Sequence, residues 1–157
     1  TLAWSTRDRE KWWGLTATQI AYWDLMPPAT ARVVVTASSG HLSSVLPVRQ
    51  GLVTQTVSGA FQVWEPGSGQ YLLVRSVLPP NPSKPFANCL AFDGQFFYTC
   101  TSNATPILTK RDGQNFTIVA TAAGPAADAA VGLTFDGYAL WMAIGGAIDR
   151  IYQLAVQ

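Results

Sequence analysis

Few side chains in this sequence could carry out chemistry, and the single histidine is one of them. His41 follows Ser39 and Gly40 in a stretch typical of a turn. One imidazole without a second ligand makes neither a metal site nor a catalytic triad. We therefore predict no metal site and no cofactor, and keep His41 only as a candidate contact residue on a loop.

Three of the nine acidic residues stand immediately before a glycine. These pairs are Asp93-Gly94, Asp112-Gly113 and Asp136-Gly137. An aspartate in this position hydrogen bonds to its own backbone and begins a turn. The pattern predicts three structural turns and assigns no catalytic residue, so we expect the chain not to be an enzyme.

Tryptophan is the residue type best suited to binding here, and the chain has six. An exposed indole can stack on a sugar or anchor a protein interface. Trp4, Trp12 and Trp13 bracket the charged segment TRDREK at 6–11 and are our candidate binding residues. That segment lacks any strand pattern, so a short helix is an alternative there. The remaining three recur at repeat positions described below and are expected to pack between repeats: Trp23, Trp64 and Trp141.

The two cysteines lie on opposite arms of one predicted hairpin. A two-residue turn at Asp93-Gly94 would place Cys89 opposite Tyr98 and leave Cys100 a diagonal neighbour. That separation is too large for easy bridging, so we predict two buried thiols.

Composition limits the classes of partner. A chain of 157 residues with 48% hydrophobic residues can bury a core as one domain. Charged residues make up only 12% and the net charge is +1, which argues against a basic surface for nucleic acid. No apolar run reaches the roughly 18 residues of a membrane span. We expect a soluble domain that binds no nucleic acid and does not insert into a membrane.

The strand-forming residues follow a repeated pattern. The stretch CLAFDGQFFYTC at 89–100 is a hairpin whose apolar arms flank Asp-Gly, a pair that suits a type I′ turn. A near copy, GLTFDGYALWMA, follows at 132–143. The same interval, stepped backwards, finds further strands near residues 46 and 2. The sequence thus contains about four repeats of about 43–44 residues, namely 2–44, 45–88, 89–131 and an incomplete 132–157.

Four short antiparallel strands at this period are the signature of β-propeller blades, which must stack to bury their faces. Trp23-Asp24 and Trp64-Glu65 end the third strands of their repeats and echo the Trp-Asp ending of WD repeats. We predict an all-β, propeller-like array of four-stranded blades in a single domain, 1–157. The alternative is a β-trefoil, because Gln62-Val63-Trp64 matches the Gln-x-Trp motif of ricin-type lectins.

The predicted array is not closed. Its fourth blade lacks a last strand, and unpaired strand edges invite pairing with another chain. We expect a segment of a longer polypeptide, or a protein that completes its ring or covers its edges in an assembly.

The third and fourth repeats resemble the repeats of bacteriophage virion propellers. The resemblance covers residues 89–154 and is carried by LAFDGQFFYTCTSNATPILTKRDGQNFTIVA and LTFDGYALWMAIGGAIDRIYQL. It implies a structural or receptor-facing component of a tail, fibre or capsid surface.

We therefore expect a non-catalytic structural or attachment component of a phage-like virion, in contact with other virion proteins or copies of itself. The expected location is the virion, with secretion as the alternative. Two other functions stay open. One is a carbohydrate-binding lectin with a host-surface glycan as ligand. The other is a sialidase-like hydrolase, because residues 110–117 resemble the Asp-box turn of sialidases.

Overall fold

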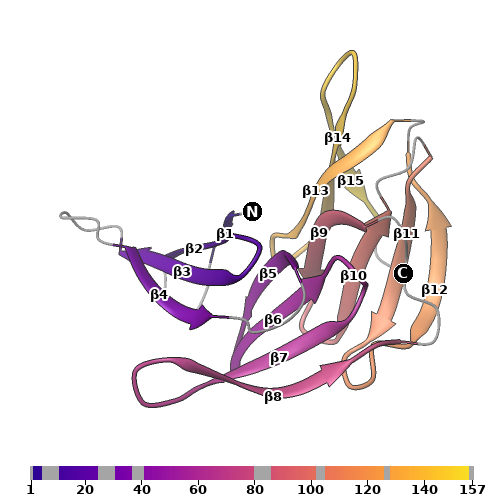
Figure 1. The fold of residues 1–157 in the computed structure, drawn as a ribbon. Helices are drawn as coiled ribbons and strands as arrows, with labels where there is room; N and C mark the ends of the chain where they lie inside the picture. The colour runs from indigo at the N-terminus through magenta and orange to yellow at the C-terminus, as the bar shows by residue number, and fades with distance from the viewer. Residues whose placement is uncertain are drawn as a thin grey trace. The chain divides into compact units, whose positions relative to one another are not determined.

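The computed structural model describes residues 2–4, 11–24, 31–36, 41–79, 86–101, 105–125 and 128–155. Within these ranges the chain is all-β, with fifteen strands in four antiparallel sheets and no helix (Figure 1). The chain divides into two compact units, Thr1–Leu78 and Pro79–Gln157, called here the N-terminal and C-terminal units. The predicted all-β fold is confirmed, and each unit contains two blade-like sheets.

The first sheet of the N-terminal unit has the strand order β1-β2-β3-β4. Its strands are β1 (Leu2–Trp4), β2 (Lys11–Leu15), β3 (Gln19–Asp24) and β4 (Ala31–Thr36). Thr16 organises the turn between β2 and β3, where its hydroxyl accepts the backbone N–H groups of Thr18 and Gln19. Because this turn is short, β2 and β3, which are consecutive in the sequence, are also adjacent in the sheet.

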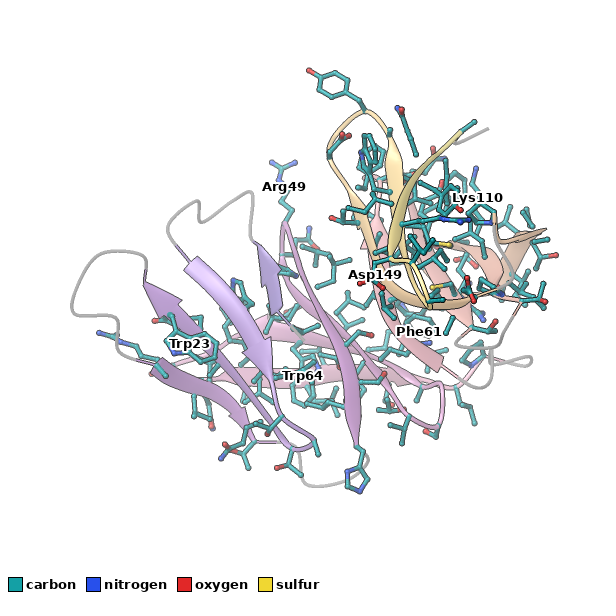
Figure 2. All side chains as sticks on the ribbon, turned by 90° about the horizontal axis from the view of Figure 1, so that it is seen from above. Trp23, Arg49, Phe61, Trp64, Lys110 and Asp149 are labelled. Atoms are coloured by element: carbon teal, nitrogen blue, oxygen red, sulfur yellow. The ribbon has the colours of Figure 1, made fainter. Side chains whose placement is uncertain are left out.

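The second sheet has the order β5-β6-β7-β8. Its strands are β5 (Leu42–Val48), β6 (Gly51–Thr56), β7 (Phe61–Pro66) and β8 (Tyr71–Val77). Arg49 and Gln50 form a two-residue turn between β5 and β6, and Arg49 points away from its tip (Figure 2). Strand β6 is buried along its whole length, whereas the outer strand β8 is largely exposed.

An apolar core joins the two sheets of the N-terminal unit. Trp64 belongs to this core, and its Nε1–H donates to the buried hydroxyl of Thr54 at 3.0 Å. The indole is therefore packed in the core, and its N–H has a hydrogen-bond acceptor. The predicted packing of Trp64 between repeats is therefore confirmed. The buried members of this core are Trp13, Ile20, Val34, Val35, Leu42, Val45, Leu52 and Trp64.

The C-terminal unit contains the third and fourth sheets. The third has the order β12-β11-β10-β9, with β9 (Phe86–Phe92), β10 (Phe96–Thr101), β11 (Ile107–Asp112) and β12 (Ile118–Ala123). The fourth has three strands in the described part of the chain, β13 (Ala129–Phe135), β14 (Leu140–Gly145) and β15 (Arg150–Leu154). Side chains of both sheets form one core, whose buried members include Cys89, Cys100, Ala130, Met142 and Ile144.

The strands predicted from the repeat agree with the observed ones within a few residues. The first strands of the four sheets begin at Leu2, Leu42, Phe86 and Ala129. Four sheets, where a trefoil needs three units, match the propeller-like prediction. The helix alternative for TRDREK falls on residues 6–11, of which 6–10 lie outside the described residues.

The turn between β9 and β10 differs from the prediction. Phe92 pairs with Phe97, so the loop contains four residues rather than two. The backbone N–H of Asp93 donates to the carbonyl of Phe96 at 3.2 Å, and only Gly94 has a positive φ, of 101°. A type I′ turn would need positive φ at both central residues. The copied hairpin between β13 and β14 has the same four-residue loop.

Cys89 and Cys100 are buried free thiols, as predicted, but their register is not the predicted one. The longer loop pairs Tyr98 with Ala91 instead of Cys89, and a bulge beside Cys100 interrupts the ladder. A hydrogen bond with the Cys89 thiol and burial together raise the pKa of Cys100. The thiols therefore behave as small apolar core side chains.

Candidate functional site

The carboxylate of the aspartate at the start of the β9–β10 loop accepts hydrogen bonds from the loop itself. Asp93 accepts the backbone N–H groups of Gln95 and Phe96 at 2.8 and 2.7 Å, and the Tyr98 hydroxyl at 2.7 Å. Burial of Asp93 opposes ionisation, but these hydrogen bonds outweigh it and lower the pKa of the carboxyl group. The carboxylate is thus committed to holding the loop.

The β13–β14 loop repeats this arrangement. Asp136 accepts the backbone N–H groups of Tyr138 and Ala139, both at 2.8 Å, and the Nε1–H of Trp141 at 2.7 Å. In both loops an aromatic side chain five residues after the aspartate supplies the third donor. Trp141 was expected to pack between repeats. It is only partly buried, and its Nε1–H donates a hydrogen bond to the aspartate of this loop.

Asp112 organises the turn between β11 and β12, which is the place of an Asp-box between the third and fourth strands. Its carboxylate accepts the backbone N–H groups of Gln114, Asn115 and Thr117 at 2.9, 2.6 and 2.9 Å, and also the Thr117 hydroxyl. The bond from Asn115, followed by that from the Thr117 hydroxyl, lowers the pKa of Asp112 to about 2. With four donors bound, this carboxylate is a structural element of the turn.

The structure describes the side chains of two of the four predicted binding residues, Trp13 and His41, and His41 does not line the cavity to which Trp13 contributes. Trp4 and Trp12 face each other across the β1–β2 ladder, but their side chains lie outside the described part of the structure. His41 is exposed just before β5, and its carbonyl accepts the N–H of Val57 at 2.8 Å. Only Trp13 contributes a described side chain to a cavity.

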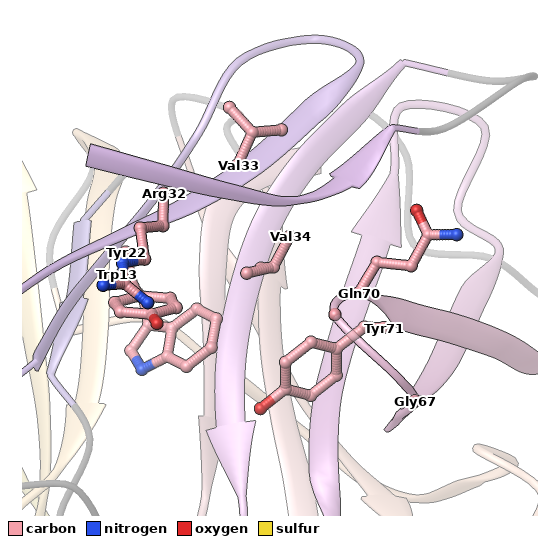
Figure 3. A pocket seen from close by; sticks show the side chains of 9 residues that line it. Trp13, Tyr22, Arg32, Val33, Val34, Gly67, Gln70 and Tyr71 are labelled. Atoms are coloured by element: carbon pink, nitrogen blue, oxygen red, sulfur yellow. The ribbon is translucent and has the colours of Figure 1, made fainter.

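That cavity lies within the N-terminal unit and has a volume of about 520 Å³ (Figure 3). A volume of this size suits a small organic ligand. One wall comes from β2, β3 and β4 of the first sheet, and the other from the β7–β8 turn and the start of β8. Its lining residues are Trp13, Tyr22, Arg32, Val33, Val34, Gly67, Gly69, Gln70 and Tyr71.

The first wall of the cavity is a row across three strands. Trp13 pairs with Tyr22, and Tyr22 pairs with Arg32, so the three side chains lie next to one another on one face of the sheet. Exposure increases along the row, from the buried indole through the partly buried phenol to the exposed guanidinium. The ring centroids of Trp13 and Tyr22 are 5.3 Å apart.

The second wall supplies a further aromatic ring and an amide. Tyr71 meets Trp13 edge to face, with ring centroids 5.7 Å apart. Gln70 precedes it in the β7–β8 turn, which is closed by a hydrogen bond of 2.8 Å from Gly67 N–H to the Gln70 carbonyl. Gly69 in this turn has a φ of 87°, a conformation that glycine adopts without strain.

One polar atom of a lining residue lacks a partner. The Nε1–H of Trp13 is buried, is not accessible from the cavity and has no hydrogen-bond acceptor among the described residues. A buried donor without an acceptor costs free energy, so such groups usually mark a missing partner. Sequence reasoning selected Trp13 from its neighbourhood but missed Tyr22, Arg32 and Tyr71, since cross-strand register was needed to bring them together.

No group of three or more histidine, cysteine, aspartate or glutamate side chains comes close enough to hold a metal ion in the described part of the chain. The same residues contain no helix that is long and apolar enough to cross a membrane. The cavity lined by Trp13, Tyr22 and Tyr71 is the candidate site for a small molecule that we consider further.

Comparison with known proteins bears on the fold. No family model and no curated protein matches this chain. Solved structures do match. A chain of the mitotic checkpoint complex superposes on 97% of this chain with a TM-score of 0.65 and 16% identity. A glutaminyl cyclase from Myxococcus xanthus covers 94% of it with the same TM-score and identity.

These are propeller-like folds. The computationally designed protein Ika4 also matches, over 98% of this chain and 89% of its own, with a TM-score of 0.55 and 16% identity. The propeller-like chain spans 46% of the matched checkpoint chain and 71% of the cyclase. At this identity the likeness establishes the propeller-like fold and its repeat nature.

Proposed function

We propose that this propeller-like chain is a non-catalytic structural or attachment component of a phage-like virion. In this proposal it acts through contacts with other virion proteins or with copies of itself. The resemblance of residues 89–154 to virion propeller repeats supports a location in a phage-like virion. One structural observation supports the mode of action, namely the character of strand β12.

Strand β12 is an exposed, uncharged edge. All six of its residues, Ile118–Ala123, are exposed, and it pairs only with β11 among the described strands. Ile118 and Val119 are 41% and 53% exposed, and the strand contains neither charge nor proline. An edge of this kind presents unpaired backbone groups and apolar side chains to any neighbouring strand.

The last strands of the other three sheets carry the protection that β12 lacks. Each contains an arginine, namely Arg32 in β4, Arg75 in β8 and Arg150 in β15. A charge on an edge strand opposes pairing with another chain. Because β12 alone among these four lacks one, we assign the assembly contact to its edge and take a second copy of the chain as the partner to test.

The experiment is light scattering coupled to size exclusion, on the wild type and on Val119→Lys. The wild type is expected to form a concentration-dependent multimer, and Val119→Lys to shift it towards a monomer of about 16.9 kDa. Ile148→Lys is the control, because Ile148 is 65% exposed but lies in the β14–β15 turn. A wild type that stays monomeric at all concentrations, or equal effects of both substitutions, would overturn this assignment.

A further inference from the structure

We propose that the cavity of the N-terminal unit binds a hexopyranose that carries a carboxylate, such as a uronic acid unit. This ligand site goes beyond the assembly contact of β12, which belongs to the other unit. The proposal rests on the shape of the cavity, its aromatic rings and the type of polar group around it.

The aromatic rings provide a surface for the face of a sugar. Tyr22 and Tyr71 come from opposite walls and are partly buried, and the buried Trp13 ring packs against both, with ring centroids 5.3 and 5.7 Å away. A pyranose has C–H groups on its faces and hydroxyls around its rim, so an aromatic wall with polar groups at its border complements it. Figure 3 shows the Trp13 and Tyr71 rings from opposite walls, with the Arg32 side chain next to Trp13 and Tyr22.

The exposed polar groups of the lining include one that only donates, the guanidinium of Arg32. The amide of Gln70 can both donate and accept, which suits a hydroxyl group. No lining residue is acidic, so no carboxylate of the cavity wall can pair with a cation.

Arg32 selects the charge of the ligand. It is the one charged residue of the lining, it is exposed, and it forms no ion pair with a described side chain. A guanidinium pairs with a carboxylate through two parallel hydrogen bonds, and it repels the quaternary ammonium ligands that aromatic cages otherwise bind. We therefore infer an acidic sugar rather than a cationic ligand.

The test is isothermal titration calorimetry of the full chain with glucuronic acid, glucose and benzoic acid at neutral pH. Glucuronate is expected to bind about tenfold more tightly than glucose, the ratio that one charge-assisted contact can supply. Benzoate, which keeps the carboxylate and a flat ring but lacks hydroxyls, is expected to bind more weakly than glucuronate.

Two variants and one control separate the contributions. Arg32→Gln should remove the preference for glucuronate and leave glucose binding unchanged, whereas Arg150→Gln, a charge-matched change in the other unit, should change neither. Tyr71→Leu should weaken both sugars several-fold, because it removes an aromatic ring from the cavity wall. Circular dichroism and thermal unfolding check that each variant is folded.

Several outcomes would overturn the proposal. They are the absence of heat with both sugars, equal affinity for benzoate and glucuronate, or equal losses in Arg32→Gln and Arg150→Gln. None of these results depends on the oligomeric state, so they are distinct from a failure of the β12 contact.

Discussion

At the scale of single residues, the polar side chains of the C-terminal unit serve the fold. Asp93, Asp112 and Asp136 each accept three or more hydrogen bonds from their own turns. Arg111 is fully buried, and its Nη1 donates to the carbonyl of Phe116 at 2.8 Å. Desolvation lowers the pKa of this guanidinium. These residue types could support chemistry, but their contacts show a structural role.

Asp112 should contribute to stability in a pH-dependent way. Its pKa is about 2 in the folded chain, below the ordinary value of 3.8, so its contribution is present above pH 4 and is lost as the pH falls towards 2. Asp112→Asn is expected to lower the unfolding free energy by about 1 kcal/mol at pH 7, after allowance for solvent screening of this exposed group.

Urea unfolding at pH 7 and pH 2.5 measures this contribution. The difference between Asp112→Asn and the wild type should shrink at the lower pH. A difference that is the same at both values would show that the Asp112 charge does not support the turn.

The two thiols should be inert while the chain is folded. Cys89 and Cys100 are at most 1% exposed, and the raised pKa of Cys100 keeps it protonated. Ellman's reagent is expected to react with neither thiol in native buffer and with both after unfolding. Rapid reaction of the native chain would contradict this placement.

At the scale of elements, the hairpin is the unit that the repeat copies. Its arms were predicted from the apolar residues that flank Asp-Gly, and these arms are strands where expected, whereas the turn between them differs from the prediction. The loop length was wrong because the Asp93 side chain binds the N–H groups of Gln95 and Phe96, which stabilises a wider loop. A dipeptide preference alone does not include these side-chain bonds.

Gly94 should be required by this wider loop. Its φ of 101° is a conformation that residues with a side chain rarely adopt, so Gly94→Ala is expected to cost about 1–2 kcal/mol. The matched control is Gly132→Ala in β13, where an added Cβ would meet the Ala143 Cβ at an ordinary 3.5 Å. Thermal unfolding of the two variants should show a lower midpoint for Gly94→Ala alone.

At the scale of the whole molecule, stability should follow the position of each strand in its sheet. The central strands β6 and β10 are bonded on both sides and buried, whereas β8 and β12 are exposed edges. Hydrogen exchange at low protein concentration should therefore be slowest in β6 and β10 and faster in β8 and β12. Equal protection of β12 and β10 under these conditions would contradict the exposed-edge description.

The sequence by itself determined the fold class, the repeat and most strand positions. Strand formation and turn position depend on neighbouring residues, so the runs of apolar residues and the Asp-Gly pairs were sufficient to predict where strands and turns lie, but not the length of the β9–β10 loop. The buried thiols and the packing of Trp64 also followed from the pattern.

Only the tertiary structure decided which side chains meet. Trp13, Tyr22 and Arg32 form a row because of strand register, and Tyr71 reaches them only when the second sheet packs on the first. The exposure of every residue of β12 likewise depends on its place at a sheet edge. Register and sheet packing join residues that are distant in the chain, and a local sequence pattern contains no information about such contacts.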